Sequence, residues 1–205
     1  MDRKRGIGKD CGLPWPKLKG DMKFFRELTT YPDRAAVEKR WGLKAGESSD
    51  IQNWEDVSAM LKFAHPLPAA SGESRNAVIM GRKTWESLPE SYRPLPERFN
   101  AILSRTVLKG VPSEGAFVWP ELHYALRDLS QNVEVDTVFL IGGGQVFVAA
   151  VKEASCVELY VTEIDAEFPC DTFFPETPDF QPVLSSPWVE EGGTRYRFRR
   201  YDRVS

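Results

Sequence analysis

The sequence contains little cysteine and little histidine. Its 205 residues include three cysteines (Cys11, Cys156 and Cys170) and two histidines (His65 and His123). The cysteines are few, odd in number and not spaced in pairs, so we expect no disulfide framework. Such cysteine usage is typical of proteins in a reducing compartment. The two histidines lie far apart without other ligand residues beside them, which argues against a histidine-based metal site. We therefore expect a protein that holds no metal.

The sequence also lacks long apolar runs and a strong excess of one charge. No stretch approaches the roughly twenty apolar residues that a membrane helix needs, and the start, MDRKRGIG, lacks the apolar region of a secretory signal. The net charge is −3 with mixed signs, which argues against a general nucleic-acid binder. With 41% apolar and 28% charged residues, the chain suits one large globular domain or two small ones. We expect a cytosolic protein that contacts neither membrane nor nucleic acid.

A glycine-rich loop near the start leads into a helix that is predicted to begin at about residue 18. Its apolar residues recur at helical spacing and predict a core-facing stripe. They are Leu18, Met22, Phe25 and Leu28. Asp21 falls on the same face and follows a glycine, so the local sequence favours a helix-capping role for it. The other interpretation is a carboxylate with a raised pKa that holds a cationic or amidine-like group in a dry pocket.

Residues 31–76 are the least regular part of the chain. An amphipathic helix is predicted there from the spacing of four apolar residues, and a loop follows it. The four residues are Trp54, Val57, Leu61 and Ala64. No pattern in this segment indicates chemistry, and we interpret it as a surface insertion.

Two apolar segments, 76–80 and 137–141, are predicted buried strands that each run through glycine into a helix. The first junction, 81–84, carries two cations and a hydroxyl, which a bound anion would stabilise at a helix start. The second, 142–144, is a triple glycine that lets backbone amides approach a pyrophosphate. The alternatives are solvated surface cations and a simple tight turn. Neither junction has the GxGxxG or Walker pattern, and the alternation of strand and helix predicts a mainly parallel sheet with a ligand site at its carboxyl edge.

Three further features have weaker signals. Arg98 is either a surface charge or a guanidinium that binds a ligand carboxylate. In the predicted strand 156–163, Thr162 faces away from the inward apolar residues. Residues 182–203 predict two antiparallel strands joined at 190–193, and we interpret the arginines of the second strand as a solvated face. These are Arg195, Arg197, Arg199 and Arg200.

Taken in order, the motifs of this chain resemble those of dihydrofolate reductase. They are GIGxxxxLPW from Gly6, an Asp six residues after that Trp and followed by xxFF, MGRKTWESLP, RPLPxR, IGGG and DxxFFP. They cover nearly the whole chain from Gly6 onward. The insertion at 31–76 and the phrase EFPCDTFFP are most similar to reductases of protozoan type, some of which are fused to thymidylate synthase. A synthase domain in a longer parent chain is therefore a suggested partner.

The resemblance implies a single reductase domain over residues 1–205 with a three-layer α/β fold. Its twisted sheet of about eight strands is mostly parallel, is flanked by helices and has an antiparallel C-terminal strand. The implied activity is NADPH-dependent reduction of 7,8-dihydrofolate to tetrahydrofolate. A related pterin or pyrimidine reductase of the same fold is the alternative, and Asp21 together with Arg98 argues against it because the two match both ends of folate.

The resemblance also implies roles for individual residues. Asp21 would hold the amidine edge of the pterin and assist protonation of its ring nitrogen, with Thr162 behind it. The loop from Gly8 to Leu13, with Trp15, would be a lid that excludes water. The implied catalytic set is Asp21, Trp15, Leu13 and Thr162.

The implied substrate-binding residues line the pterin, its aminobenzoyl ring and its glutamate tail, where Arg98 would bind the α-carboxylate. They are Ile7, Asp21, Met22, Phe25, Leu88, Leu95, Arg98, Ile141, Phe147 and Thr162. The implied NADPH-binding residues surround the nicotinamide and the phosphates, including the 2′-phosphate. They are Ile7, Gly8, Gly12, Leu13, Gly81, Arg82, Lys83, Thr84, Ser104, Arg105, Ile141, Gly143, Gly144, Gln145, Val146 and Phe147.

The sequence departs from the family pattern at two places. The family begins with an apolar strand inside the sheet, whereas here Met1 enters directly at the loop that follows it. We expect that another segment fills this place or that the chain is a marginally stable, non-catalytic NADPH- or folate-binding fragment. Phe147 stands where the family often has Tyr, so a hydroxyl near the nicotinamide is lost and slower hydride transfer is expected.

Overall fold

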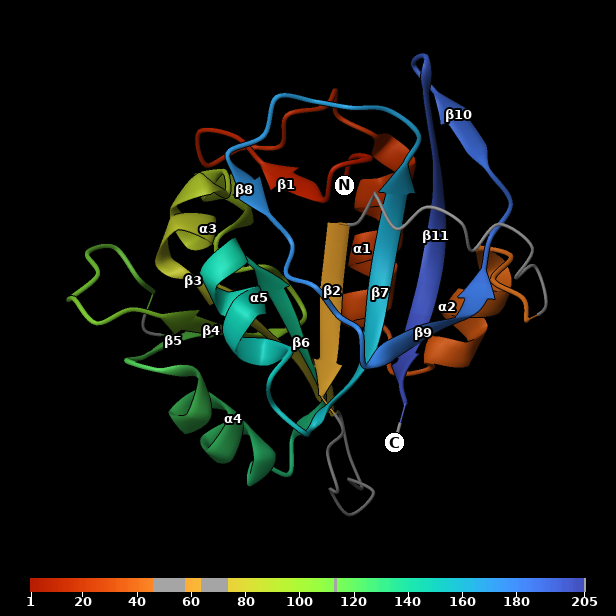
Figure 1. Cartoon of the computed structure of the whole chain (residues 1–205). Helices are drawn as coiled ribbons and strands as arrows, with labels where there is room; N and C mark the ends of the chain where they lie inside the picture. The colour runs from red at the N-terminus through yellow and green to blue at the C-terminus, as the bar shows by residue number, and fades with distance from the viewer. Residues whose placement is uncertain (46–57, 64–73, 113, 205) are drawn as a thin grey trace.

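The computed structural model describes residues 1–45, 58–63, 74–112 and 114–204. Strands and helices alternate along much of the chain, and the strands form one large sheet with helices on both of its faces (Figure 1). A separate small sheet consists of β1 (Gly6–Gly8) and β8 (Thr172–Phe173), which pair antiparallel.

In the described parts of the chain, the large sheet has nine strands in the order β10-β11-β7-β2-β6-β3-β4-β5, and β9 also pairs with β11. Their bounds are β2 (Ser58–Phe63), β3 (Arg75–Gly81), β4 (Phe99–Leu103), β5 (Ala116–Trp119), β6 (Val135–Gly142), β7 (Cys156–Ile164), β9 (Phe180–Ser185), β10 (Val189–Glu191) and β11 (Thr194–Arg203). Strands β6, β3, β4 and β5 pair in parallel. Because β2 is antiparallel to both β6 and β7, these two point the same way. All strands except β2 and β11 therefore share one direction, which confirms a mostly parallel sheet with an antiparallel C-terminal strand.

Strand β2 corrects the interpretation of residues 31–76. Residues 58–63 form a strand that pairs on both edges, with Ser58 opposite Thr162 of β7 and Leu61 opposite Leu140 of β6. The prediction of a helix is wrong for these residues, because backbone pairing on two sides outweighs a short helical spacing. Trp54, Val57 and Ala64 lie outside the described residues. A segment that occupies an interior place in the sheet is not a surface decoration.

The same place in the sheet has a second contributor. The Met1 nitrogen donates to the Thr162 carbonyl (3.0 Å), and the Ile164 amide donates to the Met1 carbonyl (2.9 Å). Met1 thus extends the pairing along β7 just beyond the Ser58 end of β2, and Figure 1 shows the N-terminus above that end. Among the described residues, β2 lies between β6 and β7 and Met1 bonds to β7 beyond it, so the expectation that another segment fills this place is met.

Helices form the outer two layers. They are α1 (Lys19–Thr30), α2 (Arg34–Arg40), α3 (Arg82–Ser87), α4 (Leu122–Ser130) and α5 (Gly144–Ala150), with a 3-10 turn, η1, at Glu90–Tyr92. In Figure 1, α1 lies behind the sheet and α5 in front of it. An aromatic cluster joins the rear layer to the sheet, since Phe24 of α1 stacks on Phe198 of β11 (ring centroids 4.0 Å apart) and Trp41 packs edge-on against both.

Helix α1 is turned differently from the predicted stripe. Leu18, Phe24 and Leu28 are buried, as expected for two of the four predicted residues. Met22 is 43% exposed, and Phe25 is only partly buried. The prediction for Met22 is wrong because the stacking of Phe24 on Phe198 sets which side of the helix meets the sheet. Met22 and Phe25 lie instead on the flank of α1.

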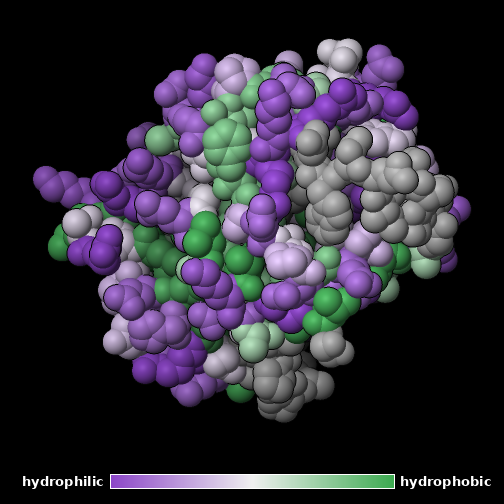
Figure 2. Space-filling model, viewed as in Figure 1, coloured by the Kyte–Doolittle hydropathy of each residue, from purple (hydrophilic) through white to green (hydrophobic). Residues whose placement is uncertain are grey.

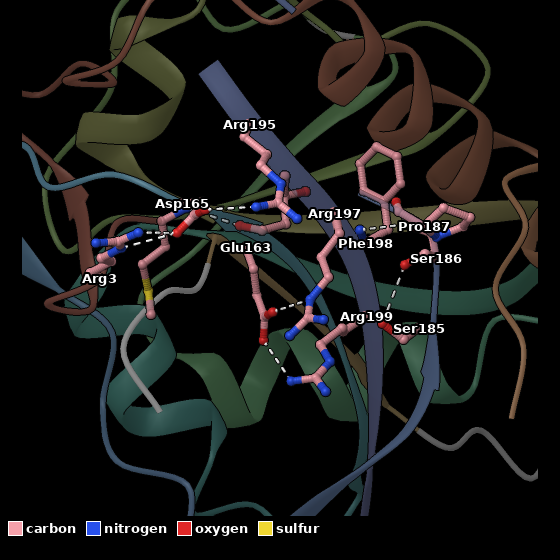
Figure 3. Close-up of polar contacts among 12 residues, drawn as sticks. Arg3, Glu163, Asp165, Ser185, Ser186, Pro187, Arg195, Arg197, Phe198 and Arg199 are labelled. Atoms are coloured by element: carbon pink, nitrogen blue, oxygen red, sulfur yellow. Dashed lines mark hydrogen bonds and ion pairs between the residues drawn. The ribbon is translucent and has the colours of Figure 1, made fainter. Parts of the chain in front are cut away.

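The arginines of β11 also differ from the prediction of a solvated face (Figure 3). Arg197 and Arg199 are buried, at 8% and 6% exposure, and both bind the buried carboxylate of Glu163. The distances are 2.6 Å from Arg197 Nε and 3.0 Å from Arg199 Nη1. The Tyr201 hydroxyl adds a hydrogen bond to Glu163 (2.7 Å). Arg195 alone remains half-exposed in this set, and it pairs with Asp165.

Hydrophilic residues cover most of the face shown in Figure 2, with smaller hydrophobic areas between them. Within the described parts of the chain, no helix combines the length and the apolar character needed to cross a membrane.

Candidate active site

Asp21 and Thr162 meet at the centre of the candidate site. Asp21 lies in the first turn of α1, and Thr162 lies near the end of β7. The Thr162 hydroxyl donates a hydrogen bond of 2.7 Å to Asp21 Oδ1. No hydrogen bond from a described residue reaches the second oxygen, Oδ2. The carboxylate is thus held on one side and open to a ligand on the other.

The surroundings of Asp21 shift its pKa upward. Burial is the largest cause, because it disfavours the charged form. The hydrogen bond from Thr162 and the Met1 amino group lower the pKa, and the charge of Glu191 raises it further. The net shift favours a carboxyl group that takes up a proton more readily than an ordinary aspartate. Such a shift is common at catalytic positions and is not by itself proof of catalysis.

The capping interpretation of Asp21 is wrong. The N-cap position of α1 is Leu18, and no side chain of the helix's own N-cap residue binds the first turn. The backbone amides of Lys19 and Gly20, which have no acceptor within the helix, donate instead to the carboxylate of Glu191, which is distant in the sequence. Asp21 is therefore free to bind Thr162.

The loop between β1 and α1 begins with a tight turn. Lys9 and Gly12 exchange two backbone hydrogen bonds (3.0 and 2.8 Å), and the residues between them, Asp10 and Cys11, have φ of 50° and 64°. The Asp10 amide donates to Asp171 Oδ2 (2.8 Å), which fastens the turn to the segment before β8. This bond is the first cause of the lowered pKa of Asp171.

The far end of this loop is anchored, and its middle is open. Trp15 is buried and packs edge-on against Phe168, with ring centroids 5.9 Å apart. Leu13 is 53% exposed. The hydrogen-bonded turn at residues 9–12 and the buried Trp15 thus fix the two ends of this stretch, and the exposed Leu13 lies between them.

The strand-to-helix junctions lie side by side at the carboxyl edge of the parallel strands. Met80 of β3 pairs with Gly142 of β6, and Gly81 pairs with Leu103 of β4. The residues that follow these strands therefore share one edge of the sheet, as the Gly-rich and basic motifs predicted. Arg82, Lys83 and Arg105 are exposed there, Thr84 is partly buried, and Ser104 donates to the Thr106 carbonyl (2.8 Å).

Gly144 has no room for a side chain. A Cβ at this position would lie 2.8 Å from Thr172 Cγ2 and 4.0 Å from Ile7 Cδ1. The contact brings β1, β8 and the start of α5 together, so Ile7 and the glycine junction belong to one neighbourhood. Phe147 points away from solvent and packs edge-on against Phe174 (5.2 Å between centroids). Gln145 is exposed, while Ile141 and Val146 are partly buried.

Arg98 is a buried cation near the other end of α1. It is 4% exposed, and its guanidinium donates to Thr29 Oγ1 (2.6 Å) and to the Pro96 carbonyl (3.0 Å). It also lies 5.8 Å from the Phe25 ring centroid. Burial and then the nearby charge of Arg26 lower the pKa of Arg98 to about 10, against a raising effect of Glu97. Among the described residues, no carboxylate forms an ion pair with it.

A side-chain clamp shapes the turn that carries Arg98. Asn100 accepts a hydrogen bond from the Leu95 amide (2.9 Å) and donates to the carbonyls of Leu95 and Arg98 (3.0 and 2.9 Å). Glu97 adopts φ of 63° within this turn. Leu95 is buried as a result, whereas Leu88, at the end of α3, is only partly buried.

The predicted residues thus gather at three places: Asp21 with Thr162, Arg98 with Phe25, and the edge formed by the two junctions. Arg105 and Gln145 lie at the edge formed by the junctions, whereas Leu88 makes no hydrogen bond or ring contact with these three places within the described chain. Sequence reasoning missed Asp171, Asn100, Thr29 and Glu191, which support the site without belonging to a local pattern. Asp171 stands within the DTFFP phrase, which was the one available signal. No cluster of three or more His, Cys, Asp or Glu in the described residues is placed to hold a metal.

Comparison with known proteins adds an independent finding. A sequence model of the family described as dihydrofolate reductase matches residues 72–203. The chain is 34% identical over 208 residues to bifunctional dihydrofolate reductase-thymidylate synthase 2 of Arabidopsis thaliana, covering 98% of this chain and 30% of that protein. It is 36% identical over 205 residues to the bifunctional protein of Daucus carota, covering 97% and 32%. It is 34% identical over 214 residues to dihydrofolate reductase of Mus musculus, covering 99% and 94%.

The chain spans about a third of the length of the two bifunctional relatives and nearly the whole length of the mouse relative. None of these three relatives is protozoan, so that part of the resemblance stays a prediction.

Proposed function

Since this chain belongs to the dihydrofolate reductase family, we propose that it reduces 7,8-dihydrofolate to 5,6,7,8-tetrahydrofolate with NADPH, the cofactor of that family. The observation that carries the proposal is the hydrogen bond between Thr162 and Asp21. It holds a carboxylate of raised pKa with one oxygen left for a ligand. This is the arrangement that the amidine edge of a pterin requires.

Asp21 has two tasks in the proposed reaction. As a carboxylate it accepts hydrogen bonds from the pterin and orients the ring. Because its pKa is raised, it also exchanges protons at a pH closer to neutrality, which suits a group that assists protonation of the ring nitrogen. Thr162 restricts the carboxylate to one rotation, and Met22 and Phe25, on the open flank of α1, are available to cover the ligand.

The glycine junctions fit the proposed cofactor. Gly144 leaves backbone within reach of a ligand where a side chain would collide with Thr172. Arg82, Lys83 and Arg105, all exposed at the same edge, supply cations for phosphate groups. When bound, NADPH supplies the hydride that the reaction adds to a pterin carbon. The protein contributes orientation, exclusion of water by the loop at residues 8–13, and the electrostatics of Asp21.

Arg98 completes the proposed substrate site. Its guanidinium is buried, is bound by neutral oxygen atoms and has no carboxylate partner in the described chain. The α-carboxylate of the folate glutamate would supply the missing charge. Phe25, which lies against Arg98, would contact the aminobenzoyl ring between the two ends.

The setting of the reaction is part of the same proposal. We place the chain in the cytosol as one reductase domain over residues 1–205. The bifunctional relatives combine a reductase and a thymidylate synthase by name, and we propose a synthase domain as the partner in a longer parent chain.

The test is NADPH oxidation, followed by absorbance, in the presence of dihydrofolate and in blanks that omit either compound. We expect turnover by the parent chain and a loss of about 10²–10⁴-fold in Asp21→Asn, the range typical of a lost acid–base group. Asp136→Asn, an equivalent change at an exposed position near the amino end of β6, should keep full activity.

A thermal melt with and without NADPH accompanies the assay. A parent chain that melts cooperatively but never oxidises NADPH with dihydrofolate would show that the proposed function is wrong. Equal rates in the parent and Asp21→Asn would remove Asp21 from the reaction.

A further inference from the structure

The first turn of α1 is held by a carboxylate from the other end of the chain. The Lys19 amide donates to Glu191 Oε1 (2.7 Å), and the Gly20 amide donates to Glu191 Oε2 (3.0 Å). The first amides of a helix have no partner within the helix and need an external acceptor. Leu18, at the N-cap position, cannot supply one from its side chain. One carboxylate therefore binds the two amides that immediately precede Asp21.

Glu191 is itself held in place. It ends β10, opposite Thr194 of β11, and the two residues of the intervening turn, Gly192 and Gly193, have φ of 59° and 78°. The Tyr196 hydroxyl donates to Glu191 Oε2 (3.1 Å). The carboxylate thus has a fixed strand, a tight turn and a hydroxyl donor behind it.

The contact between this hairpin and α1 is close enough to require glycine. A Cβ on Gly20 would lie 2.1 Å from the Tyr196 hydroxyl oxygen and 3.4 Å from Glu191 Oε2. Any larger residue would push the first turn of α1 away from the hairpin. Gly20, Tyr196 and Glu191 together therefore fix the distance between α1 and β11 next to Asp21.

The geometry points to a role for Glu191 in the reaction proposed above: we propose that it is a positioning residue, which sets the place of Asp21 relative to Thr162 by holding the start of α1. The inference rests on the proposed function of Asp21. Two supports hold this carboxylate, one through its side chain and one through the backbone before it. Thr162 fixes the side chain from β7, and Glu191 fixes the backbone from β10.

The charge of Glu191 gives this role a measurable signature. The amides of Gly20 and Lys19 lower the pKa of Glu191, so it is a carboxylate at neutral pH. Its negative charge contributes to the raised pKa of Asp21. The other groups that face Asp21 are the Thr162 hydroxyl, the Met1 amino group and Tyr196, and Lys19 lies beside Glu191. Removal of the Glu191 charge should therefore lower the pKa of Asp21.

The test compares Glu191→Gln, Glu191→Ala and the parent. Glu191→Gln keeps an oxygen for one amide and removes the charge, whereas Glu191→Ala removes both. Glu190→Gln is the matched control, because Glu190 is the exposed neighbour in the same hairpin. The pKa of the Asp21 carboxyl is measured by carbon NMR titration, which does not require turnover, and kcat, KM and their pH profiles are measured in parallel.

We expect both Glu191 variants to lower the Asp21 pKa and to move the pH profile of kcat in the same direction. Glu191→Ala should also lower kcat on the order of tenfold or more, because a shift of α1 misplaces the carboxylate, while KM for NADPH stays unchanged. Glu190→Gln should match the parent in every measurement.

Two outcomes would overturn the inference. One is a lower melting temperature in Glu191→Ala with the Asp21 pKa, kcat and pH profile of the parent, since Glu191 would then only stabilise the fold. The other is a Glu190→Gln variant with the same effects. An inactive parent whose NMR titration still responds to Glu191→Gln would refute the proposed function and leave the positioning of Asp21 supported.

Discussion

Arg98 and the pair Arg197–Arg199 are all buried guanidinium groups, yet their surroundings differ. Arg197 and Arg199 share the carboxylate of Glu163, and the Tyr201 hydroxyl binds the same carboxylate. Among the described residues, the hydrogen-bond partners of Arg98 are neutral oxygens, from Thr29 and Pro96. Burial lowers the pKa of Arg98, whereas at Arg199 the effect of burial is outweighed by Tyr201 and Glu163, which raise it.

The difference is the basis on which we propose that Arg98 is a binding cation and that Arg197 and Arg199 are structural ones. A buried charge is tolerated when a partner of opposite sign is present, and it is destabilising otherwise. Around Glu163 the partners come from the chain itself. At Arg98 the described chain offers none, so the favourable partner is one that arrives with a ligand. Burial of an arginine alone therefore does not reveal its role, and the charges of the neighbouring groups distinguish the two cases.

The largest expected effect is at the paired site. Glu163→Ala leaves two buried guanidinium groups without their carboxylate and should lower the free energy of unfolding by about 3–5 kcal/mol. Asp165→Ala is the control, because Asp165 pairs with the exposed Arg3 and Arg195 and should cost no more than about 1 kcal/mol. Urea unfolding of both variants measures the difference. Equal losses of unfolding free energy in Glu163→Ala and Asp165→Ala would show that the buried and the exposed ion pairs contribute alike to stability.

At the unpaired site the expected loss is in binding. Arg98→Met should raise KM for dihydrofolate roughly 10–150-fold, the equivalent of about 1.5–3 kcal/mol for a hydrogen bond to a charged group. The free energy of unfolding should change by less than about 1 kcal/mol, because no ion pair within the described chain is broken. Dihydropteroate, which lacks the glutamate, should show the same KM with parent and variant. A large loss of stability with unchanged KM would make Arg98 a structural residue.

The smallest expected effect is on the pH dependence of stability and concerns the carboxyl group of Asp21. Its folded-state pKa is raised, so the folded state binds a proton more tightly than the unfolded state between the ordinary aspartate value and the raised one. Stability contributed by this group is therefore greatest at low pH and falls as pH rises through the folded pKa. Asp21→Asn should raise the melting temperature at neutral pH, and the gain should shrink as pH falls. A gain independent of pH would contradict this account.

Local patterns in the sequence were sufficient for the elements of the parallel half of the sheet. The strands β3 and β6 are short apolar runs that lead through glycine into a helix, so local pattern and parallel pairing agree. The antiparallel pairing predicted for residues 182–203 is confirmed, but the first predicted strand is divided into β9 and β10, and Glu190 and Glu191 lie in β10 rather than in the turn. In these regions the information is local.

The predictions that proved wrong share one cause, which is a partner residue outside the local sequence. The face of α1 is decided by Phe198, the burial of Arg197 by Glu163, and the freedom of Asp21 from a capping role by Glu191. Glu163 lies 34 positions from Arg197, and Glu191 lies 172 positions from Lys19, so each deciding partner is beyond the reach of a local window of sequence. The pairing of Asp21 with Thr162 followed from family resemblance alone, because local sequence favoured a cap.

Strand β2 has a consequence for the order in which the molecule assembles. Both of its neighbours, β6 and β7, come much later in the chain, so in a growing polypeptide one edge of residues 58–63 has no partner until residue 142 has been made, and the other has none until residue 164 has been made. Contacts across such long separations are slow to form, and open strand edges are sites of aggregation while they wait. The completion of the sheet is therefore a late event in biosynthesis, and the yield of native protein should depend on how well those edges are shielded in the meantime.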